Sequence, residues 1–419
     1  MKNNKGITLV ALVVTIVVLL ILAGVSINLV LGNNGIIAKA KDAETKSAEA
    51  SQNDLKGMNS LIEQMESALN GSGNGTGGGS DTKVPAEATA ETAPYFPDST
   101  FTKKEGTIDT GLVIQDASGN EYVWVVVPKS LYNNAAYNNN TKNRPSSSTD
   151  YANIEYCLQQ YTATYRQDGW SDTYEADDKN VGWFADATAY NNLKNSMLKS
   201  VYENGGFYVG RYEAGIGTNR TSKSETNSDG KYTIEGMPTP LSKANAYPYN
   251  YVTRTQAKVL AEKIKYTNVD KSYTGSLMFG VQWDLVLAFM SKDTAKVTSN
   301  STTIGNYYDN LWTITNANAQ YSTNYGSTFT ACPNPYEKKS ASSILLTTGA
   351  GSGFSVQNIY DIAGNVWEWT LEKTSNASLP CALRGGYYGR TGSYFPAASR
   401  SVTDTASAGN TIGFRVTLW

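Results

Sequence analysis

The chain has 419 residues, with 35 lysines and arginines against 37 aspartates and glutamates, and no histidine. Its length favours two or three domains, and its near-neutral charge argues against a general nucleic-acid binder, which would carry a basic surplus. Without histidine, the chain cannot build a Ser-His-Asp triad or a histidine-ligated zinc or iron site. Its 28 tyrosines against 10 phenylalanines suit exposed contact surfaces, because tyrosine combines a large apolar body with a polar tip.

The N-terminal region predicts a membrane-spanning helix followed by an amphipathic one. Residues 7–31 carry no charge and are long enough to cross a bilayer, and the short basic leader MKNNKG precedes them. In the next segment, apolar residues recur three and four positions apart, which is typical of a helix with one packed seam: Leu55, Met58, Ile62, Met65 and Leu69.

This layout resembles the N-terminus of type IV pilins and pseudopilins. The resemblance implies a prepilin leader at residues 1–6, cleavage by a prepilin peptidase between Gly6 and Ile7, and a helix over 7–70. That helix would anchor the chain in the membrane and could pack against other pilin subunits. Pilins usually have glutamate at the fifth mature position, where this chain has Ala11, so filament assembly is left open. A simple uncleaved membrane anchor is the alternative.

A change of composition marks the boundary to a second region. The run GSGNGTGGGS predicts a flexible tether, and we assign residues 71–94 to a linker. The remaining residues, 95–419, combine short aromatic strands with Gly-rich turns. Hydrophobic patterning predicts strands at 121–128 and 205–215, helices at 253–264 and 283–290, and a polar surface loop at 133–150.

Three motifs in the C-terminal third resemble the signature of the formylglycine-generating, sulfatase-modifying family. They are YDIAGNVWEWT at 360–370, LRGGYY at 383–388 and IGFRV at 412–416. The resemblance implies an α+β fold of the C-type-lectin-like kind over residues 95–419, with few helices and much irregular structure. Within the motifs, we expect Trp367 and Trp369 to be buried anchors. We also expect Arg384 and Arg415 to pair with internal carboxylates such as Glu368.

The chemistry of that family does not transfer to this chain. Its formylglycine-generating members use two cysteines between the RGG and GFR motifs, and residues 387–412 contain none. Other branches bind iron through histidine, so we expect no catalytic residue and no redox cofactor. Members of the family also bind calcium through oxygen atoms, so the resemblance implies calcium as a cofactor, with Asn365 and Glu368 as candidate ligands. The three cysteines are Cys157, Cys332 and Cys381, and we interpret them as buried thiols. At most one disulfide can form among them.

The last long loop has the composition of a binding surface. Residues 387–404 are rich in tyrosine, serine, arginine and glycine, as antibody paratopes are. Some lectin-like members of the superfamily are variable proteins of diversity-generating retroelements, whose binding residues lie in this stretch. The candidate contacts are Tyr387, Tyr388, Arg390, Tyr394, Phe395, Arg400 and Asp404. The alternative is an ordinary irregular surface loop.

The leading hypothesis is a non-enzymatic binding protein. A single-pass helix would hold it in the cell membrane, and the extracytoplasmic domain would meet a protein or glycan ligand at the cell surface. Two alternatives stay open: a structural pilus or pseudopilus subunit, and an enzyme of the same superfamily that uses metal-assisted chemistry through oxygen ligands.

Overall fold

The computed structural model describes residues 87–223, 225–268 and 271–419. In this part of the chain no helix is long and apolar enough to cross a membrane. The leader, the predicted span at 7–31 and the amphipathic segment all lie outside the described residues.

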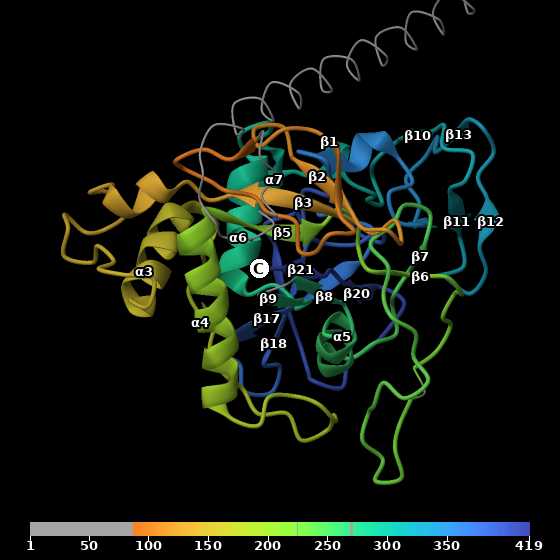
Figure 1. Cartoon of the computed structure of the whole chain (residues 1–419). Helices are drawn as coiled ribbons and strands as arrows, with labels where there is room; N and C mark the ends of the chain where they lie inside the picture. Colours follow the sequence, from red (N-terminus) through yellow and green to blue (C-terminus); the bar gives the residue numbers. More distant parts are fainter. Residues whose placement is uncertain (1–86, 224, 269–270) are drawn as a thin grey trace, which may run out of the picture. The chain divides into compact units, whose positions relative to one another are not determined.

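Two larger sheets form the centre of the domain (Figure 1). The first is antiparallel, in the order β1 (Thr102–Glu105), β2 (Val113–Gln115), β3 (Glu121–Val126), β5 (Gly206–Gly210), β21 (Thr417–Leu418). The second has the order β19 (Arg400–Thr403), β18 (Cys381–Arg384), β17 (Trp367–Thr374), β20 (Ile412–Phe414), and β4 (Trp170–Ser171) also pairs with β17. Only the β17–β20 pair in this sheet is parallel.

The other strands form separate small sheets, most of which are two-stranded pairs. They are β6 (Gly215–Ile216) with β7 (Tyr247–Pro248), β8 (Lys265–Asn268) with β9 (Lys271–Thr274), β10 (Thr313–Ile314) with β13 (Tyr336–Glu337), and β15 (Ser355–Val356) with β16 (Ile359–Tyr360). A three-stranded sheet has the order β12 (Thr330–Ala331), β11 (Gln320–Ser322), β14 (Leu345–Leu346). Between these pairs, long irregular stretches connect the elements, as Figure 1 shows.

Helices are few. The α-helices are α3 (Tyr151–Tyr161), α4 (Ala187–Asn204), α5 (Arg254–Ala261), α6 (Gly280–Met290) and α7 (Lys296–Ser299). Short 3₁₀ turns are η2 (Lys129–Asn133), η3 (Ala163–Tyr165), η4 (Thr302–Ile304) and η5 (Ser352–Phe354). The sheet-rich architecture with few helices and much irregular structure fits the expected C-type-lectin-like domain.

Helix α6 is the internal element that ties the two sheets together. It is apolar around its circumference, as a fully buried helix must be, and it contacts both β3 and β17. Its N-terminus is held by a distant carboxylate: Gly280 N and Val281 N donate to Asp172 at 2.6 and 2.9 Å. Two of the four unpaired N–H groups at the start of the helix are satisfied in this way.

The flanking helices follow their local end signals. Helix α4 begins where the Asp186 side chain accepts from Ala189 N, and it ends at Gly205, whose φ of 67° suits glycine. A side chain at Gly205 would also collide with Glu91 O, 2.1 Å from the Cβ position. Helix α5 begins with a capping box between Thr253 and Gln256.

The packed region begins before the expected boundary at residue 95. Thr92 is buried; its hydroxyl donates to Gly205 O at 2.8 Å and accepts from Trp124 Nε1 at 2.7 Å. Ala93 N donates to Asn204 O, and Tyr95 lies in the core. Residues 87–94, assigned from composition to the linker, therefore include contacts of the domain itself. Composition could not show this, because the contacts are made by single residues such as Thr92 and Glu91 in a stretch without a hydrophobic pattern.

The predicted strands and helices of this region are present. The strand expected at 121–128 is β3, and the one expected at 205–215 is β5 with β6. The helices expected at 253–264 and 283–290 are α5 and α6. The polar loop expected at 133–150 contains neither helix nor strand, except for Asn133, the last residue of a 3₁₀ turn that begins at Lys129.

Candidate functional site

The loop over residues 385–399 leaves the second sheet and returns to it at a buried charged base. Arg384 at the end of β18 and Arg400 at the start of β19 are directly paired across the two strands. Both bind the same two carboxylates, Asp284 of α6 and Glu372 of β17, at distances between 2.6 and 3.0 Å. The Arg400 side chain is only 1% exposed. We call these four residues the arginine clamp.

The backbone of the loop is fixed by a second segment, residues 301–309. The Tyr307 hydroxyl lies within hydrogen-bond distance of two loop carbonyls, 2.9 Å from Gly385 O and 2.8 Å from Phe395 O. Tyr308 N donates to Arg390 O at 2.8 Å. Hydrogen bonds along the loop leave it little freedom, so its surface side chains project from a fixed frame.

Glycine is required where the loop begins. Gly386 has a φ of 81°, and a Cβ there would lie 2.4 Å from Phe395 O and 2.9 Å from the Tyr307 ring. The close approach of the two sides of the loop therefore depends on the second glycine of the RGG motif.

Exposed side chains gather on the tip of this loop. Tyr394 is 69% exposed and Arg390 is also exposed, while Tyr387 and Phe395 are half-buried. Together with Gly389, Thr391 and the 40% exposed Tyr308, Arg390 and Tyr394 line a pocket of about 410 Å³. That volume is within the range of small-molecule sites, roughly 300–1,000 Å³. We call this the loop pocket.

The sequence-predicted contact residues therefore separate into two groups. The structure brings Arg390 and Tyr394 together in the loop pocket. In contrast, Tyr388 is 1% exposed and accepts a hydrogen bond from Asn410 Nδ2 at 2.6 Å, and burial raises the pKa of its phenol. Arg400 belongs to the arginine clamp. Neither is available to a ligand in this structure, because each is buried against its own domain.

The other three candidate contacts, Asp404, Tyr387 and Phe395, are half-buried and lie outside the lining of the loop pocket. Asp404 is half-buried, and its Oδ1 accepts from Ala406 N at 2.7 Å, which makes it a turn residue. Tyr387 and Phe395 rest on Trp367, with ring centroids 6.2 and 4.8 Å away, so they offer only their outer edges. Tyr308 escaped sequence reasoning because it lies far upstream of the loop, in a segment without a motif.

The residues proposed for calcium do not fit that ion. Both Glu368 oxygens accept from Arg415, with the closest contact at 2.6 Å. Asn365 Oδ1 accepts from Asn306 Nδ2 and Leu346 N, and its Nδ2 donates to Glu213 at 2.7 Å. The oxygens that calcium would need are therefore occupied by protein donors. Elsewhere in the described residues, no cluster of three or more His, Cys, Asp or Glu side chains could hold a metal.

The motif residues instead build the scaffold. Trp367 and Trp369 are buried, and Trp369 Nε1 donates to Val252 O at 2.9 Å. The expected internal pairing is confirmed for Arg415, which binds Glu368, and for Arg384 through the arginine clamp.

The cysteines have the surroundings of structural thiols. All three lie in the described part of the chain, and each is free and buried. Burial raises the pKa of each thiol to about 11, so each is protonated at neutral pH. A protonated thiol is a poor nucleophile.

Comparison with known proteins supports the C-terminal assignment. Residues 288–418 match the model of the sulfatase-modifying factor enzyme 1-like domain. Among curated proteins, none matches the chain.

Two solved structures show low similarity to this chain. CarF has a TM-score of 0.30 at 13% identity over 59% of this chain and 95% of its own. Treponema denticola variable protein 1 has a TM-score of 0.25 at 13% identity over 51% of this chain and 95% of its own.

Proposed function

We propose that this domain is a non-enzymatic ligand-binding module whose contact surface is the loop pocket. The observation that carries the proposal is the contrast between the two ends of the 385–399 loop. Its base is locked by the arginine clamp, whereas its tip exposes Tyr394 and Arg390 beside Tyr308. A rigid frame that presents aromatic and guanidinium groups binds at low entropic cost, because little order is lost on association.

The side chains of the loop pocket indicate the chemistry of the ligand. Two tyrosine rings offer flat apolar faces with polar tips, and Arg390 offers a fork of donors to a carboxylate or phosphate. This combination suits an exposed protein loop or a glycan that carries an acidic group. We further propose that the hydrophobic N-terminal segment, residues 7–31, holds the protein in the cell membrane with this module on the outside.

Binding to glycan and protein arrays by the full-length chain tests the proposal. The double variant Arg390→Ala/Tyr394→Ala should lose at least tenfold in affinity for the ligand found, as expected for central aromatic and arginine contacts. The matched double variant Arg144→Ala/Tyr325→Ala removes exposed residues of the same types outside the loop pocket. It should bind as the wild type does. Equal losses in both variants would contradict the proposed site.

The retroelement resemblance adds a proposal about variation. We propose that the exposed Arg390 and Tyr394 and the half-buried Tyr387 can change without loss of the frame, whereas Arg384 and Arg400 cannot. Sequencing this gene in independent isolates should therefore find substitutions concentrated at the first three positions. Substitutions spread evenly over 384–400 would contradict the idea.

A further inference from the structure

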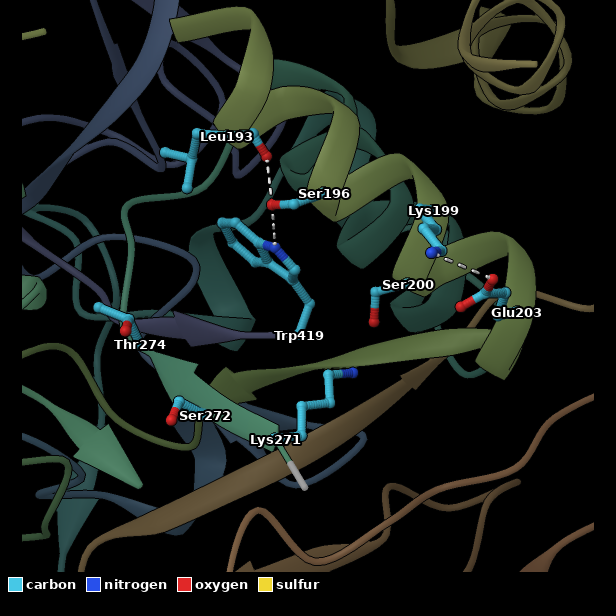
Figure 2. A pocket seen from close by; sticks show the side chains of 9 residues that line it. All are labelled: Leu193, Ser196, Lys199, Ser200, Glu203, Lys271, Ser272, Thr274 and Trp419. Carbon is cyan, nitrogen blue, oxygen red and sulfur yellow. Dashed lines mark hydrogen bonds and ion pairs between the residues drawn. The ribbon is translucent and has the colours of Figure 1, made fainter. Parts of the chain in front are cut away.

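A second pocket, of about 550 Å³, lies between α4 and β9 (Figure 2). None of its lining residues belongs to the 385–399 loop or to the segment that supports it. Trp419 forms one wall, and its ring is fixed because Nε1 donates to Ser196 Oγ at 3.0 Å. The volume is within the range of small-molecule sites.

Lys271 is the basic residue of this pocket that forms no close ion pair, although Glu203 of the same pocket attracts it at longer range. Among the described residues, no carboxylate oxygen lies within 4.0 Å of its ammonium group. Instead, the nitrogen lies 4.7 Å from the centroid of the Tyr273 ring and 5.5 Å from that of Tyr95. Partial burial lowers the pKa of Lys271, although the residue as a whole is exposed. An anion bound in the pocket would stabilise the charged form of Lys271, which burial disfavours.

The second ammonium of the pocket is only loosely paired. Lys199 lies 3.9 Å from Glu203 across one helical turn, and both side chains are nearly half exposed. Such pairs contribute little and exchange partners easily. Figure 2 shows Lys271 extending from β9 toward α4, where Ser200 faces it. The pocket is thus lined by two ammonium groups and one carboxylate, and Lys271 is the lysine that has no described carboxylate within 4.0 Å.

Hydroxyl groups surround these charges. The Ser272 and Thr274 hydroxyls make no side-chain hydrogen bond to any described residue, and both line the pocket. Hydroxyl groups can donate and accept, so they suit a ligand that is itself rich in hydroxyls. The apolar wall of Trp419 offers a ring against which the body of such a ligand can rest.

We infer that this pocket is a second binding site, for a small carbohydrate that carries a carboxylate or a phosphate. Lys271 holds the anionic group, Lys199 adds a second contact to it, and the hydroxyls of β9 bind the sugar. The site is independent of the loop pocket, since the two share no residue.

Calorimetric titration of the full-length chain with glucuronate, glucose 6-phosphate and glucose tests the inference. At least one of the two anions should bind saturably, and glucose should bind at least tenfold more weakly; the tighter anion identifies carboxylate or phosphate as the group recognised. Lys271→Met keeps the apolar stem and should lower the affinity for that anion at least tenfold. The matched variant Lys296→Met, which removes an exposed lysine on α7, should leave it unchanged.

Lys199→Met provides a second measurement that does not alter β9. It should lower the affinity for the anion by a smaller factor than Lys271→Met does. The inference is overturned if neither anion binds at millimolar concentration or if glucose binds equally well. It is also overturned if folded Lys271→Met, judged by an unchanged circular dichroism spectrum, binds like the wild type. Because the loop pocket is untouched by these variants, array binding should be retained in all of them whatever the titration shows.

Discussion

Replacing Arg400 by alanine should destabilise the domain strongly, although its loop has the composition of an exposed binding surface. The Arg400 side chain is 1% exposed and binds Asp284, Glu372 and the carbonyl oxygen of Tyr165. Its removal leaves two buried carboxylates that share one remaining arginine, Arg384.

The magnitude follows from the one negative charge that loses its counter-charge, since Arg384 alone then faces both carboxylates. Breaking a buried ion pair by removal of one member costs about 3–5 kcal/mol, because the other member stays buried and uncompensated. Arg390→Ala, which removes the same side chain from an exposed position of the same loop, should change the free energy of unfolding by less than about 0.5 kcal/mol. Arg400→Lys should recover little, since lysine cannot bind two carboxylates as a planar fork does.

Urea denaturation followed by tryptophan fluorescence measures these differences. The wild type, Arg400→Ala, Arg400→Lys and Arg390→Ala should be compared at one pH, with the slope of the transition checked for constancy. A loss below about 1 kcal/mol for Arg400→Ala, or equal losses for the alanine variants at 400 and 390, would refute the role assigned to the arginine clamp.

Three further predictions concern other parts of the chain. Tyr307→Phe removes the hydroxyl that donates to Phe395 O, whereas Gly385 O keeps its hydrogen bond from Gly364 N; the variant should cost about 1–3 kcal/mol in urea denaturation and weaken ligand binding at the loop pocket, and an unchanged stability would contradict this role. Burial, with added repulsion from Glu372, raises the pKa of Asp172 from 3.8 to about 7, so the folded chain holds this proton to a higher pH than the unfolded chain does. The free energy of unfolding should therefore fall as the pH rises from about 4 to about 7, and Asp172→Asn should flatten that dependence; parallel pH profiles would count against it. In cells with a prepilin peptidase, N-terminal mass spectrometry should find Ile7 as the first residue, and an intact leader would exclude the predicted cleavage after Gly6.

Sequence patterns predicted the elements whose burial follows a local period. The apolar stripe of α5 follows the period of a helix, and β3 is a short continuous apolar run that is buried on both faces; in each case a single segment of chain contains that information. Helix α4 was not predicted: its buried apolar residues are few and separated by asparagine, lysine and serine.

The candidate site was predicted only in part, because the burial of its side chains depends on residues far away in the sequence. Composition predicted a contact surface in the loop after the RGG motif, and within that loop Tyr394 and Arg390 are exposed. Composition could not show that Arg400 points inward, because that depends on Asp284, which lies in α6 far upstream. The GNVWEW motif gave Trp367 its correct place in the core, but a motif does not reveal whether oxygen atoms such as those of Glu368 are free or occupied.

The arginine clamp has a consequence for protein engineering. Because Asp284 and Glu372 lie outside the loop, the ends of the loop are joined by contacts that do not depend on the residues between them. Each doubling of a loop's length costs only about 0.6 kcal/mol in closure entropy, which is small beside the cost of about 3–5 kcal/mol for breaking the clamp. Foreign peptides inserted at the exposed tip, between Ser393 and Tyr394, should therefore be carried as constrained loops on a folded domain, which makes this fold a frame for displaying chosen epitopes.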